Sequence, residues 1–335
     1  MRYRSTILYL VAALVLGGVY FLDVRSEKKE EAREEKARIL FPDIPDTLTR
    51  LAIERADGTV VLERTSGGEN EEAWMVTAPV RTEADAFSVN RITSLLPHLT
   101  CSRVVRESAD DLGSFGLDDP ALGVTWAGDK TSGSLSIGEQ SPMDKDFYAR
   151  TGDQPRIVLL AAHNKEVLDK DLYDLRDKRL FTLAYDRVTR MAVEQPSGAW
   201  AFVKSGETTW ALEGDPDFPM DSDRVNAIVR KLSWEEAASF EEEESNDLSP
   251  YGLDTPGLRI ALSGGETREE LHVGKVVEEG EGEARRYART LQRPQVLTVK
   301  AEFLQDLPES LEDLRRKEPE PEEAPTPDSA GELPG

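Results

Sequence analysis

The sequence predicts an α+β protein in which an N-terminal transmembrane helix precedes two duplicated, mainly antiparallel α+β units. Three observations lead to this prediction. An uncharged apolar run occupies residues 7–22, short motifs recur at a nearly constant spacing, and each copy combines strand-like segments with one clear amphipathic helix. The segments between the predicted strands are too short for crossover helices, which favours antiparallel pairing.

Composition narrows the classes of function. The 335 residues include 41 basic and 65 acidic side chains, which give a net charge of −24. Such a surface repels the phosphate backbone, so we expect no nucleic-acid partner. A single cysteine, Cys101, excludes an intramolecular disulfide framework and a cysteine-rich zinc or iron–sulfur site. Hydrophobic residues make up 39% of the chain, which is sufficient for a core.

Residues 7–22 predict a membrane anchor. These 16 residues carry no charge, and residues 5–6 extend the run to about 27 Å of helix, close to the hydrocarbon thickness of a bilayer. The alternative is a cleaved signal peptide, which needs a shorter apolar region followed by a small-x-small cleavage site. Residues 19–21 read Val-Tyr-Phe instead. We therefore expect an uncleaved signal anchor over residues 1–22.

The orientation of this anchor depends on opposing signals. Arg2 and Arg4 favour a cytoplasmic N-terminus, whereas six basic residues within 23–40 favour the reverse. A short basic N-terminus that leads directly into an apolar run is typical of a signal anchor that exports the chain behind it. We expect a single-pass protein of the bacterial inner (cytoplasmic) membrane, with the bulk of the chain extracytoplasmic, or periplasmic.

Charged segments flank the predicted globular region. Residues 23–45 begin with closely spaced Glu, Lys and Arg, a pattern that favours a solvated helical stalk, which Pro42 and Pro45 end. Residues 318–335 combine Pro, Glu and Gly with almost nothing to bury, so we expect a disordered acidic tail.

Between stalk and tail, the chain repeats itself. Residues 48–51 recur at 188–191, Trp74 at Trp210, 89–92 at 225–228, 115–120 at 251–256, 135–138 at 271–274 and 148–150 at 287–289. The order of the motifs is preserved, and the spacing between copies is nearly constant. The sequence therefore predicts two repeats, at 46–183 and 184–317, and leaves open whether a pseudo-twofold axis or a translation relates them.

Each repeat shows the same succession of elements. In the first, Asp57-Gly58 lies between two alternating segments and predicts a hairpin. Asp85 is placed to cap an amphipathic helix, as Asp221 is in the second copy. The remaining predicted elements of the first repeat are strands at 121–126, 133–137, 147–150 and 156–160 and a last helix over 167–175.

These residues carry a resemblance. An anchor, a hairpin before a Trp, the Val-Asn-x-Ile helix, the (Phe/Tyr)-Gly-Leu-Asp-x-Pro element and the Leu-x-(Ile/Val)-Gly strand together resemble the domain-of-unknown-function family 4340 over residues 48–315. Members are often membrane-anchored with one or two copies, and are commonly encoded beside ABC-type permeases and gliding-motility components. The resemblance implies an accessory role in the cell envelope and supplies no catalytic residues.

No motif names a reaction. His98, His163 and His272 lie in different predicted elements without a second ligand at metal-binding spacing, so we expect no metal site there. Cys101 has no catalytic partner motif and is interpreted as a buried small side chain. The sequence contains no glycine-rich phosphate-binding motif, so any nucleotide site must belong to another chain, and no cofactor is expected.

An aspartate cluster offers two interpretations. Asp215, Asp217, Asp221 and Asp223 place carboxylates at near-alternate positions, which can hold calcium. The spacing lacks the glycine and terminal glutamate of an EF-hand, and two prolines fit a plain loop. The default interpretation is a loop that ends in the Asp221 cap.

The sequence therefore predicts a non-enzymatic envelope accessory or adaptor, with an ABC-type permease among its expected partners. The alternative is a glycan or cell-wall polymer binding module, and a hydrolase is the third hypothesis. If a partner surface exists, we expect it where the repeats differ. There the second copy carries the candidate patch of Glu241, Glu242, Glu243, Glu244 and Tyr251, and the first copy carries Arg103 and Arg106.

Overall fold

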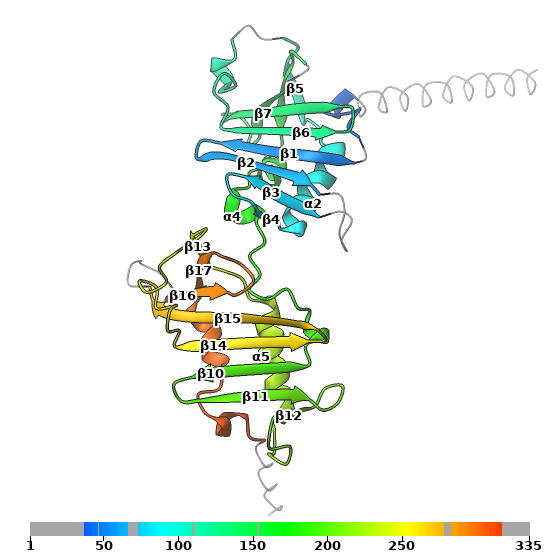
Figure 1. Cartoon of the computed structure of the whole chain (residues 1–335). Coiled ribbons are helices and arrows are strands. Elements are labelled where there is room, and N and C mark those ends of the chain that lie inside the picture. Colours follow the sequence, from blue (N-terminus) through cyan, green and yellow to red (C-terminus); the bar gives the residue numbers. More distant parts are fainter. Residues whose placement is uncertain are drawn as a thin grey trace, which may run out of the picture. The chain divides into compact units, whose positions relative to one another are not determined.

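The computed structural model describes residues 37–45, 47–65, 73–108, 111–152, 154–277 and 283–316. The chain divides into two compact units between Asp177 and Lys178 (Figure 1). The predicted anchor at 1–22, most of the predicted stalk and the predicted tail lie outside the described residues. Within the described ranges, every helix is too short or too polar to cross a bilayer.

The described residues of the first unit form a nine-stranded sheet in which each strand is antiparallel to its neighbours. In spatial order the strands are β4 (Thr82–Glu83), β3 (Trp74–Ala78), β2 (Gly58–Arg64), β1 (Leu48–Arg55), β6 (Leu122–Gly128), β7 (Ser132–Gln140), β8 (Phe147–Thr151), β9 (Ile157–Leu160) and β5 (Arg103–Arg106). The predicted hairpin joins β1 to β2, and Gly58 takes the positive φ of +140° that its turn requires.

The second unit repeats this arrangement in an eight-stranded antiparallel sheet of described residues. Its spatial order is β12 (Trp210–Leu212), β11 (Gly198–Lys204), β10 (Arg190–Gln195), β14 (Leu258–Gly264), β15 (Thr267–Val276), β16 (Arg285–Thr290), β17 (Val296–Lys300) and β13 (Ser239–Glu242). Each of these strands occupies the place of its counterpart in the first unit. The predicted duplication is therefore confirmed at the level of sheet order.

Few helices accompany each sheet. They are α2 (Ala86–Leu95), α3 (Ala162–Leu168), α4 (Leu172–Leu175) and the 3₁₀ turns Leu96–His98 and Gly113–Phe115 in the first unit, and α5 (Ser222–Trp234) with the 3₁₀ turns Tyr185–Arg187, Ala301–Asp306 and Leu311–Leu314 in the second. Both predicted N-caps are present: the side chain of Asp85 accepts from the Ser88 amide at 2.7 Å, and that of Asp221 accepts from the Arg224 amide at 3.1 Å. The prediction of mainly antiparallel units that combine strands and helices is confirmed at this coarse level, with fewer helical residues than strand residues among those described.

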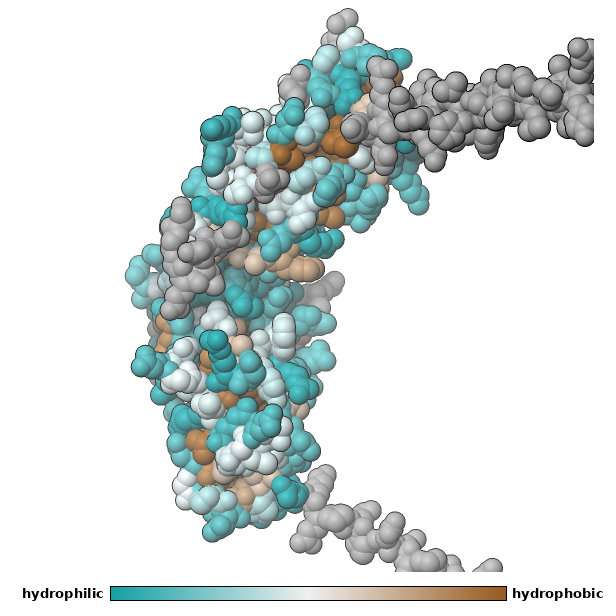
Figure 2. All heavy atoms as spheres, turned by 90° about the vertical axis from the view of Figure 1, so that its right-hand side faces the viewer, coloured by the Kyte–Doolittle hydropathy of each residue, from teal (hydrophilic) through white to brown (hydrophobic). Residues whose placement is uncertain are grey.

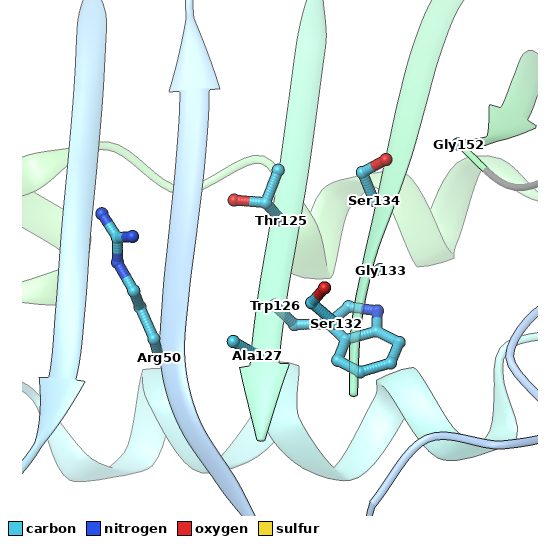
Figure 3. A pocket seen from close by; sticks show the side chains of 8 residues that line it. All are labelled: Arg50, Thr125, Trp126, Ala127, Ser132, Gly133, Ser134 and Gly152. Carbon is cyan, nitrogen blue, oxygen red and sulfur yellow. The ribbon is translucent and has the colours of Figure 1, made fainter. Parts of the chain in front are cut away.

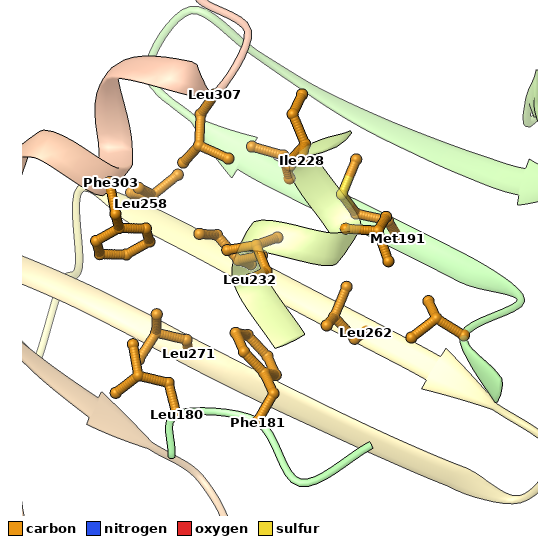
Figure 4. Close-up of a cluster of buried hydrophobic side chains, with 14 of the residues drawn as sticks. Leu180, Phe181, Met191, Ile228, Leu232, Leu258, Leu262, Leu271, Phe303 and Leu307 are labelled. Atoms are coloured by element: carbon orange, nitrogen blue, oxygen red, sulfur yellow. The ribbon is translucent and has the colours of Figure 1, made fainter. Parts of the chain in front are cut away.

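Each unit has its own core between the sheet and its main helix. In the second unit, Ile228 and Leu232 of α5 pack with Met191, Leu262 and Leu271 of three neighbouring strands (Figure 4). In the first, Val89 and Ile92 of α2 belong to a separate cluster. These apolar faces supply the main driving force for folding each unit.

The units begin earlier than the sequence predicts. Leu40 and Phe41, assigned to the stalk by sequence, are buried in the first core, and the Leu40 amide donates to the Leu99 carbonyl at 2.8 Å. Leu180 and Phe181 hold the equivalent places in the second core, ahead of the predicted boundary between positions 183 and 184. The prolines at 42 and 45 therefore follow a short buried entry segment and do not end a solvated stalk.

The last predicted helix, 167–175, is also different in the structure. It is divided into α3 and α4, because the chain leaves the helix at Asp169 and the Asp171 side chain starts a new one by accepting from the Asp174 amide at 2.8 Å.

Candidate functional site

Among the described residues, each sheet has one face covered by helices and one face largely free of them. In Figure 1, α5 lies behind the sheet of β10, β14 and β15, and α2 lies on the equivalent face of the first sheet. Alternate residues of the strands therefore point into the core or onto the open face. The surface seen in Figure 2 is mostly hydrophilic, with apolar residues in small patches. Both pockets described here lie on the open faces.

The first pocket lies over β1, β6 and β7 and has a volume of ≈ 490 Å³. Its lining residues are Arg50, Thr125, Trp126, Ala127, Ser132, Gly133, Ser134 and Gly152. Figure 3 shows how Arg50, Thr125 and Ser134 come from neighbouring strands. The register aligns them, since Arg50 pairs with Ala127 and Thr125 pairs with Ser134. Small side chains at the centre of this face leave the space that forms the pocket.

The second pocket lies over β10, β11, β14 and β15, with a volume of ≈ 330 Å³. It overlaps the place of the first pocket on β10, β14 and β15, and it also extends over β11. Ala192, Ala201 and Ala261 lie directly opposite one another across these strands and form its floor. Arg190 corresponds to Arg50 of the first pocket, since both occupy the same position in the repeated segments 48–51 and 188–191. The two pockets thus share part of their lining positions, which carry different side chains apart from the arginine.

Ion pairs occupy the rim of the second pocket. Arg190 binds Glu213 through two bonds, Nε to Oε1 at 3.2 Å and Nη2 to Oε2 at 2.7 Å, and this contact raises the pKa of Arg190 and lowers that of Glu213. Arg259 pairs with Glu194 at 2.8 Å. The charged side chains of this rim are therefore largely paired with one another.

Glu270 completes this network from β15. Burial alone raises the pKa of its carboxyl, but hydrogen bonds from His272 and Arg268 outweigh burial and lower the pKa. The separations are 2.7 Å to His272 Nε2 and 3.0 Å to Arg268 Nη2. His272, for which the sequence indicates no second metal ligand, thus belongs to a hydrogen-bonded network with Glu270 and Arg268.

The predicted acidic patch lies at an edge of the second sheet. β13, its edge strand, contains Glu241 and Glu242 but ends before Glu243 and Glu244. The Gln295 side chain donates to Glu243 at 3.3 Å, and Ser239 Oγ donates to Glu241 at 2.6 Å. The patch is therefore partly tied to its own sheet.

Tyr251 contacts this patch directly. Its hydroxyl donates to Glu242 Oε1 at 2.6 Å, and this hydrogen bond to an anionic acceptor raises the pKa of Tyr251 to about 12. Tyr251 and Glu242, two residues of the candidate patch, are thus in direct contact.

Tyr251 belongs to the duplicated Gly-Leu-Asp-x-Pro turn, which packs closely on a strand in each unit. Gly116 and Gly252 both adopt positive φ, at 65° and 66°. A Cβ on Gly138 would lie 2.2 Å from the Phe115 carbonyl oxygen, and one on Gly274 would lie 2.1 Å from that of Tyr251. The two glycines of the recurrent strand motif are therefore required by the close approach of this turn.

The other candidate residues are dispersed. Among the described residues, no three His, Cys, Asp or Glu side chains are grouped as metal ligands. Cys101 is buried, and burial raises the pKa of its thiol. Asp221 caps α5, as predicted. Sequence reasoning missed the pockets, although the alternation of small residues such as Ala199 and Ala201 with large ones was a signal for an unfilled strand face.

Comparison with known families identifies the chain. A model described as "Domain of unknown function (DUF4340)" matches residues 74–216 and 210–326. The chain belongs to this family. The two matches begin at the equivalent residues Trp74 and Trp210, which confirms two tandem copies. No curated protein and no solved structure matches the chain.

Proposed function

We propose that this chain is a non-enzymatic, membrane-anchored extracytoplasmic accessory or adaptor protein of an envelope complex, such as one built on an ABC-type permease. The observation that carries the proposal is the pair of open sheet faces, one in each unit, each with a shallow pocket. Helix-free faces of this kind present fixed arrays of side chains to a partner. The apolar run at 7–22 supports the anchor.

The electrostatics disfavour a hydrolase. Acid–base catalysis by two carboxylates needs environments that push their pKa values apart. In the second pocket, the hydrogen bonds from Arg190 lower the pKa of Glu213, and those from His272 and Arg268 lower that of Glu270. Both groups are thus ionised at neutral pH, which suits recognition by charge.

The glycan alternative has less support. Sugar-binding faces offer exposed aromatic rings, but Trp126 in the first pocket is only 6% exposed, and Trp200 in the second pocket is partly buried against the core. The strongly exposed Phe87 and Trp234 lie at opposite ends of α2 and α5, away from both pockets. Protein binding is therefore the function we propose.

The anchor and orientation are tested with reporters fused after Gly335. We expect a reporter that works only outside the cytoplasm to be active and one that works only in the cytoplasm to be silent. The opposite pattern would overturn the extracytoplasmic location.

The adaptor role is tested by copurification of the full chain from membranes, with partners identified by mass spectrometry. A recurrent envelope partner is expected. The quadruple change of Glu241, Glu242, Glu243 and Glu244 to Gln should weaken capture of a basic partner, and the difference from wild type should shrink as salt is raised. Unchanged capture and salt dependence would remove the acidic patch from the proposal.

A further inference from the structure

The first pocket differs from the second in having unused hydrogen-bond donors. Among the described residues, the hydroxyls of Thr125, Ser132 and Ser134 make no hydrogen bond within the protein. Arg50 has a single weak ion pair, Nε to Glu63 Oε1 at 3.7 Å, and its side chain is 56% exposed. These groups remain available to a ligand.

In the second pocket, the charged side chains at the equivalent positions are paired with other side chains of the protein. Arg190 is held by two bonds to Glu213. Glu270 stands where the first pocket has Ser134, directly before the repeated Leu-x-(Ile/Val)-Gly motif. Arg268 likewise replaces Ser132 and pairs with Glu270. The duplicated fold therefore has one pocket with neutralised charges and one with an exposed cation among hydroxyls.

The chemistry of the first pocket selects an anion. Its described lining contains one guanidinium and three hydroxyls but no carboxylate or carboxamide side chain. Arginine presents a planar fork of donors that matches carboxylate and phosphate oxygens. A neutral sugar is usually held by acidic or amide acceptors and an exposed ring, which this lining lacks. We propose that the first pocket binds a small oxyanionic group, a carboxylate or a phosphate, through Arg50, Thr125 and Ser134.

The three proposed ligand-binding side chains come from neighbouring strands and share one face of the sheet. Thr125 and Ser134 are directly paired across β6 and β7, and Arg50 reaches the same face from β1 beside Ala127. Because Ala127 and Gly152 have small side chains or none, they leave space at the centre of the pocket for a ligand of a few atoms (Figure 3). The inference is independent of the proposed adaptor function, because it concerns a small ligand in one unit.

The test is calorimetric titration of the full chain in neutral detergent with inorganic phosphate, acetate and glucose. We expect saturable binding of at least one anion, no competition by glucose, and weaker binding at higher chloride concentration. Arg50→Gln should reduce affinity about tenfold or more, because it removes the positive charge and the planar fork of donors. Thr125→Val should reduce affinity about threefold, because it removes one hydroxyl donor and keeps the β-branched shape.

Arg190→Gln is the matched control, because it changes the equivalent arginine of the other pocket. It should alter the affinity less than about twofold, since Arg190 is already held by Glu213. A second titration uses glycerol phosphate oligomers: tighter binding than phosphate supports a polymer as the source of the anion, and equal binding supports a free anion. Absence of saturable binding by every anion, equal losses in Arg50→Gln and Arg190→Gln, or competition by glucose would each overturn the assignment.

Discussion

The two units hold equivalent entry segments by different means. In the first, Phe41 packs edge-on against Trp126, with ring centroids 5.6 Å apart. In the second, Leu262 stands at the place of Trp126, and the segment after Phe181 is held by Glu269. This buried carboxylate accepts from the Thr182 amide at 2.7 Å, from the Leu183 amide at 3.1 Å and from the Thr182 hydroxyl.

The difference shows how a duplicated fold diverges. The first-unit residue equivalent to Glu269 is Gly133, where a Cβ would fall 2.5 Å from the Trp126 ring. A large ring and a glycine in one copy thus correspond to a smaller side chain and a buried anion in the other. Sheet order is preserved, while the contacts that fasten the entry segment change from apolar to polar.

The largest expected effect tests a feature that the units share. Gly138→Ala and Gly274→Ala should each destabilise their own unit by about 3 kcal/mol, since the new Cβ meets a backbone oxygen that cannot move aside. Hydrogen exchange followed by mass spectrometry reports each unit separately. Gly257→Ala is the control, because its Cβ would meet nothing nearer than Arg286 Nη2 at 3.7 Å. Clearly unequal losses for the two glycines would contradict their equivalence.

The next prediction tests the hydrogen bonds by which Glu269 holds the entry segment of the second unit. Glu269→Gln should destabilise the second unit by about 2 kcal/mol, because the Thr182 and Leu183 amides, which both donate to Oε2, exchange an ionised acceptor for a neutral one, and the Thr182 hydroxyl must turn from donor to acceptor. Protection from exchange should fall first in peptides that contain Thr182 and Leu183. Protection of the first unit serves as the internal control. Unchanged exchange in these peptides would show that Glu269 does not hold the entry segment.

A third prediction concerns identical residues in different settings. Asn226 accepts from Trp210 Nε1 at 2.7 Å and donates to the Thr208 carbonyl at 2.7 Å, whereas the equivalent Asn90 is exposed. Asn226→Ala should therefore cost about 1–2 kcal/mol of unfolding free energy. Asn90→Ala should change it by less than about 0.5 kcal/mol, measured by the same exchange method. Equal costs would contradict the difference in burial.

The smallest expected effect is a change in the pKa of Tyr251. Glu242→Gln should lower the pKa of Tyr251 from about 12 toward 10, because the phenol loses its anionic acceptor. Absorbance at alkaline pH, with Tyr251→Phe as the reference for assigning the signal, measures the shift. Since the folded pKa is raised above the unfolded value, the associated stabilisation is present below pH 10 and is lost as pH rises toward 12. Phe115 at the equivalent place in the first unit has no such group. An unchanged Tyr251 titration in Glu242→Gln would refute the hydrogen bond.

The features that could be predicted from the sequence are those that depend on residues close together in the chain. The Asp57-Gly58 hairpin and the Asp85 and Asp221 caps depend on neighbouring residues, and all three are present. The pockets depend on strands that meet across the sheet, such as β1 with β6, so their residues are far apart in sequence. The Glu269 contact spans 87 residues to Thr182 and carries no local signal. Sequence therefore locates the repeats better than the sites on them.

The family matches begin and end at other residues than the structural units do, and this offset has a consequence for folding. Residues 74–216 carry β3 to β9 of the first unit and then β10 to β12 of the second. β10 pairs with β14 as β1 pairs with β6, so β10 to β12 have the shape to add beside β6 in place of β1 to β3. Two segments of the nascent chain therefore match the same sheet position, and we expect exchange of these three-strand segments between the tandem copies to be the characteristic misfolding route of this architecture.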